Sequence, residues 1–251
     1  MPGARLDVLH LDLADLSSVA DAARRVPGLV DGLDVVLCNA GITETRGRQS
    51  TADGLELMMG VNALAHVALV ASLAGTPGLL RPGARVVTVG SIASRWSPLD
   101  ATDLQAERSF TSFRQYGRSK TAVMAFAFEL DRRWRAVGRD AIALSAHPGF
   151  ALDSLSPARP GVNEPSPSAR VLARPARLTT QGKDAGAWPL VHACVGADVR
   201  GGEFWGPDGW QETTGHPAPA RARPHARDPL AGARLWAAAE RATGVRFDVR
   251  P

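Results

Sequence analysis

The pattern of apolar and polar positions predicts short strands alternating with longer helices. Runs rich in Val, Ile or Leu and bounded by Gly, Pro or Asp predict strands at 4–12, 34–41, 84–91, 141–149 and 201–207. Apolar residues at helical spacing predict helices at 16–26, 54–75, 117–137, 184–196 and 228–243. Apolar strands that alternate with helices are typical of a parallel sheet covered on both faces. We therefore expect a single α/β domain over residues 1–251, with a doubly wound parallel sheet.

Ligands bind to open sheets of this kind at the carboxyl ends of the strands. The candidate functional residues there are Asp12, the sequence NAG at 39–41, Ser91 and the sequence HPG at 147–149. The segment 151–182 follows the fourth strand, is rich in Pro, Ser and Arg, and has no clear period. Two interpretations of this segment stay open, a lid over the site and an ordinary surface loop.

Tyr116 and Lys120 form the most specific pair in the chain. Tyr116 is the only tyrosine, Lys120 is one of two lysines, and they lie four residues apart on one face of a predicted helix. A phenol with a pKa of about 10 is a poor acid or base at neutral pH, but a nearby ammonium group favours its ionised form. The pair therefore predicts a proton donor and acceptor. Ser91, at a strand end, could stabilise charge on a reacting oxygen, although a serine after a strand is also common in turns.

Two further polar residues have competing interpretations. Asn62 lies among apolar residues in a predicted helix, where an asparagine competes with the backbone hydrogen bonds. It indicates either a functional contact or an irregular helix. His147 is interpreted as a packing residue at a strand end, because no second metal-binding residue type lies at a suitable spacing. We expect no metal site.

The composition narrows the class of protein. Residues are 45% hydrophobic and 22% charged, which is ordinary for a globular protein. The net charge of +4 comes from scattered arginines offset by 25 acids, densest at 221–227, and we expect no nucleic-acid partner. Cys38 and Cys194 have no metal-ligand spacing and are interpreted as free thiols in a reducing, cytoplasmic setting. We expect neither an export signal nor a membrane span.

Several motifs in this order resemble the short-chain dehydrogenase/reductase family, best its retinol-dehydrogenase-like and protochlorophyllide-reductase-like branch. They are VLHLDLADLSSV, DVVLCNAGI, MMGVNALAHVALV, ARVVTVGSIAS, YGRSK and ALSAHPG. The resemblance implies a Rossmann-like fold and hydride transfer between a nicotinamide cofactor and a carbonyl or alcohol. From the branch alone, NADP(H) is expected rather than NAD(H). A small apolar substrate is expected, and Trp96, Trp205 and Trp210 suggest an apolar pocket.

The resemblance also implies roles for individual residues. Tyr116 would be the general acid/base, and Lys120 would lower its pKa and hold the nicotinamide ribose. Ser91 would orient the substrate oxygen, and Asn62 would support a proton-relay water chain. The implied cofactor contacts are Asp12, Leu13, Asn39, Ala40, Gly41, Tyr116, Lys120, Pro148 and Gly149.

The front of the chain departs from the family pattern. The family begins with a strand, a glycine-rich TGxxxGxG turn, a helix and a second strand, and nothing in this sequence matches them. We therefore expect an N-terminally truncated fold without its first two strands, with a gap between residues 4–12 and 34–41 and without the main phosphate site. Met1 is expected to be an internal methionine of a longer reading frame or the start of a truncated gene product.

Two alternatives to catalysis remain. The first is a catalytically inactive remnant that acts as a binding or dimerising module, a homodimer through helices 54–75 and 117–137. The second is a nucleic-acid binder that uses the arginine-rich tail, for which the sequence gives thin support.

Overall fold

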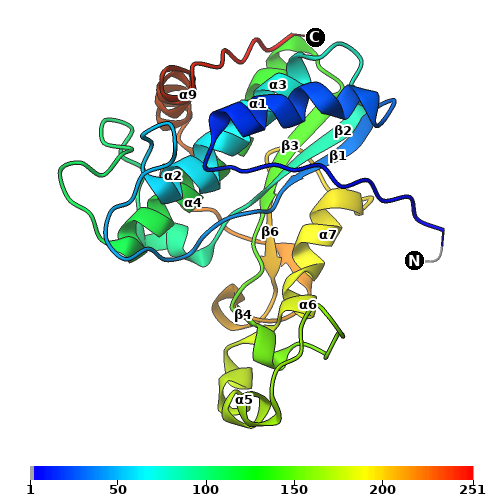
Figure 1. Cartoon of the computed structure of the whole chain (residues 1–251), viewed down its shortest axis with the longest axis vertical. Coiled ribbons are helices and arrows are strands. Elements are labelled where there is room, and N and C mark those ends of the chain that lie inside the picture. The colour runs from blue at the N-terminus through cyan, green and yellow to red at the C-terminus, as the bar shows by residue number, and fades with distance from the viewer. Residues whose placement is uncertain (1–2, 251) are drawn as a thin grey trace.

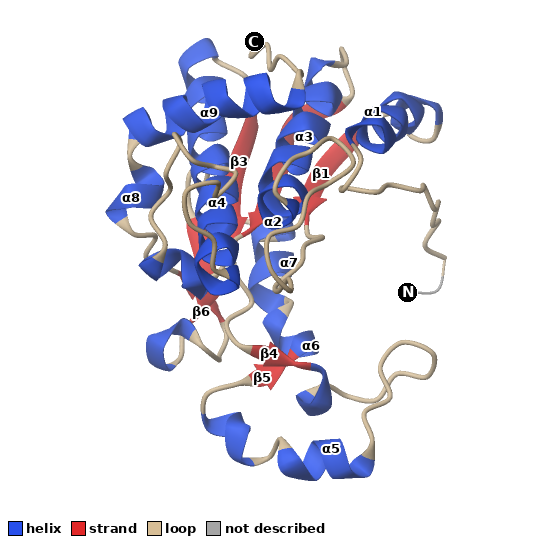
Figure 2. Ribbon diagram, turned by 60° about the vertical axis from the view of Figure 1, so that its left-hand side comes forward, coloured by secondary structure: helices blue, strands red, loops and turns tan. Residues whose placement is uncertain are grey.

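The computed structural model describes residues 3–250 and is built on a five-stranded sheet (Figures 1 and 2). Its strands in spatial order are β1 (Leu33–Cys38), β2 (Leu80–Val89), β3 (Ala141–Ala146), β6 (Phe204–Pro207) and β7 (Pro217–Pro219). The first four strands pair in parallel and β7 pairs antiparallel with β6. The predicted α/β class and parallel sheet are confirmed. β7 was not predicted, because its two prolines argue against a strand inside a sheet. The structure places β7 at the sheet edge, where proline is tolerated.

Helices cover both faces of the sheet. One layer holds a stretch formed by α2 (Leu57–Met59), a π-helical turn (Gly60–Leu64) and α3 (Ala65–Gly75), together with α4 (Ser112–Val137) and α9 (Pro229–Thr243). α1 (Leu16–Arg25) packs on α3, and α7 (Trp188–Val195) covers the opposite face of the sheet. The remaining short helices are α5 (Pro167–Leu172), α6 (Lys183–Gly186) and α8 (Pro224–Arg227).

The core follows from the alternation of side chains along β2. Ala84 and Val86 pack toward α3, α4 and α9, whereas Val87 and Val89 pack toward α7. Both faces of the strand are therefore buried, as a parallel sheet requires. The stretch Leu57–Gly75 is long and apolar enough to cross a membrane, but most of it is buried between the sheet and the neighbouring helices, as in the core helix of a folded domain.

The prediction of a strand at 4–12 is wrong. These residues form no strand, and Leu6 and Val8 are 87% and 97% exposed. Among the described residues β1 pairs only with β2, so it forms the edge of the sheet on this side (Figure 1). A strand requires a neighbour for its backbone groups, and residues 4–12 have none. Met1, for which the sequence suggested an internal start, lies outside the described residues.

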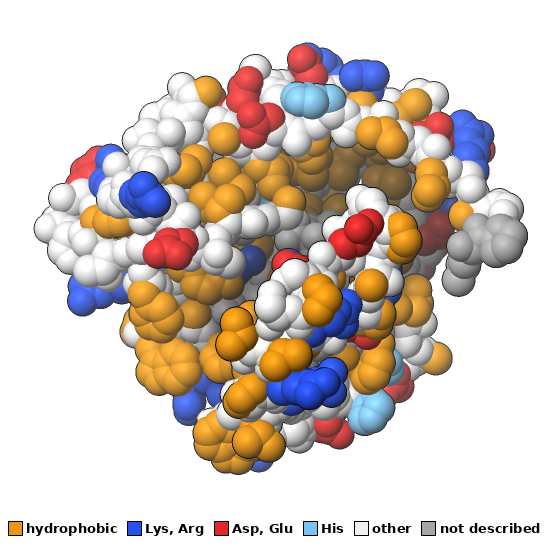
Figure 3. Space-filling model, turned by 60° about the horizontal axis from the view of Figure 1, so that its bottom comes forward, with side chains coloured by type: hydrophobic (Ala, Val, Ile, Leu, Met, Phe, Trp, Pro, Cys, Tyr) orange, Lys and Arg blue, Asp and Glu red, His pale blue; other side chains and the backbone are white. Residues whose placement is uncertain are grey.

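Residues 151–182 form a separate lobe at the carboxyl ends of the strands (Figure 1). The lobe contains α5 and a small parallel pair, β4 (Ala151–Leu152) with β5 (Gln181–Gly182). Figure 3 views the molecule from this end and shows a hollow beside the lobe with hydrophobic side chains around it. The position suits a lid, and that role stays a prediction.

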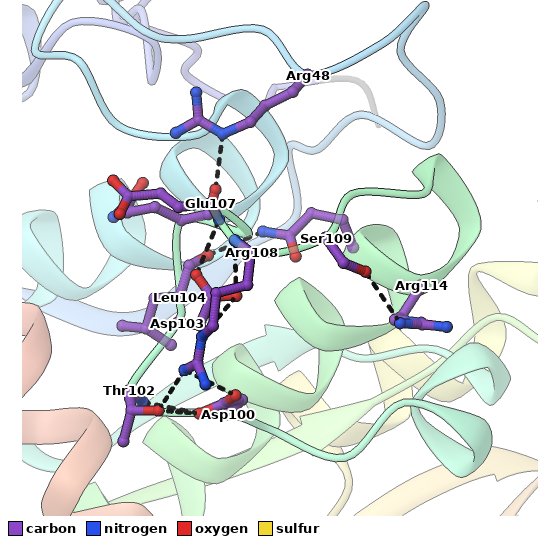
Figure 4. A network of polar contacts seen from close by, with 11 residues as sticks. Arg48, Asp100, Thr102, Asp103, Leu104, Glu107, Arg108, Ser109 and Arg114 are labelled. Carbon is purple, nitrogen blue, oxygen red and sulfur yellow. Dashed lines mark hydrogen bonds and ion pairs between the residues drawn. The ribbon is translucent and has the colours of Figure 1, made fainter.

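A polar network fixes the loop that leads into α4 (Figure 4). The Asp103 carboxylate accepts the backbone N–H of Glu107 at 2.8 Å, and the Arg108 guanidinium donates to the Thr102 hydroxyl at 2.6 Å. The loop in turn presents the Leu104 carbonyl to the Gln115 side chain at 2.9 Å. The first turn of α4 is therefore held in place at Gln115, one residue before Tyr116.

Candidate active site

A cavity of about 740 Å³ lies where the carboxyl ends of β1, β2 and β3 meet α4 and the lobe. Five of the residues expected to act in catalysis or to bind the cofactor line it: Asn39, Ser91, Tyr116, Pro148 and Gly149. The expectation that separate strand ends converge on one site is confirmed for these residues. Its other lining residues are mainly apolar, among them Val89, Trp96, Phe113, Phe150, Leu152 and Leu190.

Tyr116 and Ser91 are adjacent in this cavity. Ser91 ends the extended backbone after β2, and its hydroxyl accepts the backbone N–H of Ala93 at 3.2 Å. Burial raises the pKa of the Tyr116 phenol above its ordinary value, and the hydrogen bond with Ser91 offsets part of that rise. Tyr116 is therefore a neutral phenol at neutral pH, which makes it a proton donor.

Lys120 is buried one helical turn after Tyr116. Its ammonium donates to the Val89 carbonyl at 2.9 Å and lies 5.9 Å from the centroid of the Tyr116 ring. Burial lowers the pKa of Lys120 from 10.5 to about 8, so the group is mostly charged at neutral pH. Burial of the phenol is the larger influence on Tyr116 in this structure, and a lowering of its pKa by Lys120 stays a prediction.

Asn62 lies in the π-helical turn, so the irregular helix suggested by the sequence is present. Its carboxamide accepts the N–H of Ile42 at 2.8 Å and donates to the Ile42 carbonyl and to the Ser119 hydroxyl, each at 2.9 Å. The same side chain restricts position 41 to glycine, because a Cβ on Gly41 would lie 2.8 Å from Asn62 Oδ1. Asn62 thus ties the strand end after β1 to α4, and its part in a water chain stays a prediction.

His66 is a buried residue of this site that the sequence reasoning missed. Its Nε2 lies 2.9 Å from the Ala40 carbonyl, so it supports the strand end after β1. Burial lowers the pKa of His66 to about 4, and the ring is neutral at physiological pH. The available signal was its spacing, four residues after Asn62 on the same face of the helix.

The remaining candidates lie at varying distances from the cavity. Asp12 is exposed, and its carboxylate accepts a hydrogen bond from the backbone N–H of Ala14 at 2.8 Å. The Leu13 side chain packs between α1 and α3. Neither lines the cavity.

Of the three tryptophans expected at an apolar pocket, only Trp96 lines this cavity. Trp205 is buried in the core because β6 is covered by α7, and Trp210 is exposed on a turn.

Several residues of the cavity wall were not expected from the sequence, among them one basic and two aromatic residues. Phe113 comes from the start of α4, Phe150 from the turn after β3, and Lys183 from α6.

No cluster of three metal-binding side chains occurs between residues 3 and 250. Cys38 is a buried free thiol and Cys194 a half-buried one.

A parallel sheet with helices on both faces and a cavity at its strand ends defines the class of α/β dinucleotide-binding proteins. Residues 2–150 match the model of the short chain dehydrogenase family. The chain therefore belongs to the short-chain dehydrogenase/reductase family, and its branch is the retinol-dehydrogenase-like one. This is a family of oxidoreductases.

The relatives and solved structures agree with this placement. Mouse polyprenol dehydrogenase is 32% identical over 98% of this chain and 70% of its own length. Human retinol dehydrogenase 13 is 31% identical over 94% of this chain and 68% of its own length. The crystal structure of an uncharacterized protein from Mycobacterium paratuberculosis has a TM-score of 0.71 and 33% identity, over 95% of this chain and 75% of that one. A Burkholderia cenocepacia short chain dehydrogenase in complex with NADP has a TM-score of 0.50 at 23% identity, over 74% of this chain and 67% of that one, and shows the fold alone.

Proposed function

We propose that this protein transfers hydride between NADP(H) and an apolar carbonyl or alcohol, with Tyr116 as the acid/base. The observation that carries the proposal is that Ser91 and Tyr116 line one apolar cavity, while the buried ammonium of Lys120 lies 5.9 Å from the centroid of the Tyr116 ring. Reduction of a carbonyl needs a proton donor beside the carbonyl oxygen when its carbon receives hydride, and the Tyr116 hydroxyl supplies one.

The residues at the strand ends fit the nicotinamide end of such a cofactor. Lys120 offers a buried cation beside Gly41, where a Cβ would lie 3.4 Å from its Nζ. Pro148 and Gly149 form an opposite wall of backbone and small side chains. Among residues 3–250 there is no glycine-rich turn between a strand and a helix that could hold the pyrophosphate. The roles assigned to these residues therefore concern the reacting end of the cofactor alone.

A nicotinamide bound at this site would supply the hydride for a carbonyl carbon, or take one up from an alcohol. Ser91 donates a hydrogen bond to the substrate oxygen and holds it beside Tyr116. The Tyr116 hydroxyl then gives its proton to that oxygen, and the phenolate recovers a proton from solvent. Lys120 stabilises the transient phenolate by its charge.

The cavity supports an apolar substrate, because Trp96, Phe113, Phe150 and Leu152 line its mouth and wall. The preference for NADP(H) over NAD(H) is proposed on the resemblance to the retinol-dehydrogenase-like branch alone. The free thiols of Cys38 and Cys194 support a reducing, cytoplasmic location.

The alternative of a non-catalytic dimerising module is less well supported. It requires free faces on the two long helical stretches. Residues 57–68 are buried apart from the half-buried Leu57, and residues 119–131 are buried apart from the half-buried Phe128. Both stretches serve the core of this fold rather than a partner.

The test is NADPH oxidation, followed by absorbance, with a series of aldehydes from small and polar to bulky and apolar. We expect turnover to rise with apolar size. Tyr116→Phe should reduce turnover by at least about 100-fold while NADPH binding, measured by calorimetry, is kept. Turnover that survives the loss of the phenol hydroxyl would refute the assigned role.

A further inference from the structure

Three turns meet behind the wall of the cavity around one buried histidine. His147 is fully buried at the end of β3, Arg95 follows β2, and Glu212 lies on the turn after β6. His147 Nε2 is 3.1 Å from Glu212 Oε2, and Arg95 Nη2 is 2.6 Å from the same oxygen. Arg95 Nη1 also donates to the Gln211 carbonyl at 3.1 Å. The loops after three different strands are thus joined through one carboxylate.

The contacts of His147 define its protonation state. The backbone N–H of Gly149 donates to His147 Nδ1 at 3.2 Å, so Nδ1 is an acceptor and Nε2 carries the hydrogen that Glu212 accepts. Both ring nitrogens keep these hydrogen bonds only when the ring is neutral. A proton on Nδ1 would face the Gly149 N–H and push the turn at 148–149 away.

The surrounding backbone is shaped to admit this contact. Gln211 and Glu212 have φ angles of 52° and 59°, a left-handed conformation that side-chain-bearing residues rarely adopt. A Cβ at Gly206 would collide with His147 Nε2. A strained turn that persists at a half-buried ion pair indicates that the pair holds the turn in place.

The network ends at residues that line the cavity but does not itself line it. His147 precedes Pro148 and Gly149 in one wall, and Arg95 belongs to the short helix that Ser91 caps in the other. Phe150 N–H donates to the Thr213 carbonyl at 2.8 Å, which adds a backbone link between two of the turns. Both walls therefore depend on the position of the Glu212 turn.

We propose that His147, Glu212 and Arg95 form a positioning unit that holds Ser91 and the Pro148–Gly149 turn in register across the cavity, and that this register is lost when His147 is protonated. The kinetic consequence rests on the function proposed above. The structural consequence does not, because it concerns only how three turns are held together.

The charged groups that face His147 are Glu212 and Arg95. From β6 it meets the Phe204 ring, with centroids 5.0 Å apart, and Gly206, neither of which carries charge. Burial lowers the pKa of His147 below 6.5, and Glu212 offsets part of that shift. The unit is therefore intact at neutral pH and opens as the pH falls through the lowered pKa of His147.

Two neighbouring positions provide a matched pair of variants. Glu212→Gly removes the carboxylate but suits the left-handed backbone, so the variant should fold. Gln211→Gly makes the same backbone change one residue earlier and keeps the carboxylate. His147→Asn is the second test variant, because its short side chain can still accept the Gly149 N–H but cannot reach Glu212.

The first measurement is hydrogen exchange by mass spectrometry at neutral pH, which needs neither cofactor nor turnover. We expect Glu212→Gly to increase exchange in both 91–97 and 147–150 by at least about tenfold, and Gln211→Gly to leave both unchanged. His147→Asn should increase exchange in 91–97 more than in 147–150. If exchange rises only in 208–215, or equally in both glycine variants, the unit does not exist.

The second measurement is the pH dependence of kcat/KM with NADPH and an aldehyde. Glu212→Gly should lower kcat by about 10- to 100-fold with a smaller change in KM. The wild type should lose activity at acid pH along a limb that His147→Asn lacks. Full kcat with an unchanged profile in folded Glu212→Gly contradicts the inference. A wild type without any turnover contradicts the proposed function instead, and the exchange result then decides the inference alone.

Discussion

Replacing Lys120 by methionine should stabilise the protein at neutral pH while removing a functional charge. The pKa of about 8 in place of 10.5 means that burial disfavours the ammonium by roughly 3 kcal/mol, at about 1.4 kcal/mol per pH unit. Methionine has a similar length and no charge, but the Val89 carbonyl loses its donor, at about 1–2 kcal/mol. The net gain expected for Lys120→Met is about 1–2 kcal/mol at pH 7.

The sign of this effect depends on pH. A lysine whose folded pKa is lowered carries its full penalty below pH 8 and loses it as the pH rises toward 10.5. Urea unfolding at pH 7 should therefore show the methionine variant as the more stable protein, with the difference falling through zero between about pH 9 and 10. Lys183→Met, at the exposed second lysine, is the control and should change little. A variant less stable than wild type at both pH values would refute the assignment of Lys120 as a destabilising buried charge.

Three shorter predictions follow from the same structure. Because burial raises the pKa of Tyr116, aldehyde reduction should proceed at neutral pH while alcohol oxidation should rise toward alkaline pH; initial rates in both directions test this, and an acid optimum for oxidation contradicts it. Gly117→Ala should cost about 1–3 kcal/mol in urea unfolding, since a Cβ would collide with Ser97 Oγ, and unchanged stability would show that the neighbours yield freely. Cys38, whose pKa burial raises to about 12, should resist thiol reagents in the folded protein, with Cys194 reacting first; mass spectrometry of labelled peptides decides the order.

The sheet and its strand ends were predictable because they depend on local patterns. β2 and β3 are apolar on both faces, and Ser91 and Pro148 follow directly after them. The segment 4–12 has an equally strand-like pattern, yet it forms no strand, because pairing depends on neighbours that the local sequence does not describe. Strand prediction therefore failed for 4–12, which pairs with no strand among the described residues, and succeeded for segments such as β1 and β2 that have a partner strand.

The site was predictable only in part, for a similar reason. Tyr116 and Lys120 are close in sequence, so helical spacing places them together. Glu212 lies 65 residues after His147, and no periodicity connects them. His147 looked like a packing residue from its neighbours alone, and the structure shows that its ring nitrogens join two turns.

The most direct test of the central claim is transfer of a labelled hydride. The wild-type chain would be incubated with NADPH carrying deuterium in both hydrogen positions of the reactive nicotinamide carbon and with a bulky apolar aldehyde, and the product analysed by mass spectrometry. We predict an alcohol with one deuterium on its carbinol carbon, formed at least about 100-fold more slowly by Tyr116→Phe. An alcohol without deuterium, no alcohol at all, or equal rates in the two proteins would contradict the account.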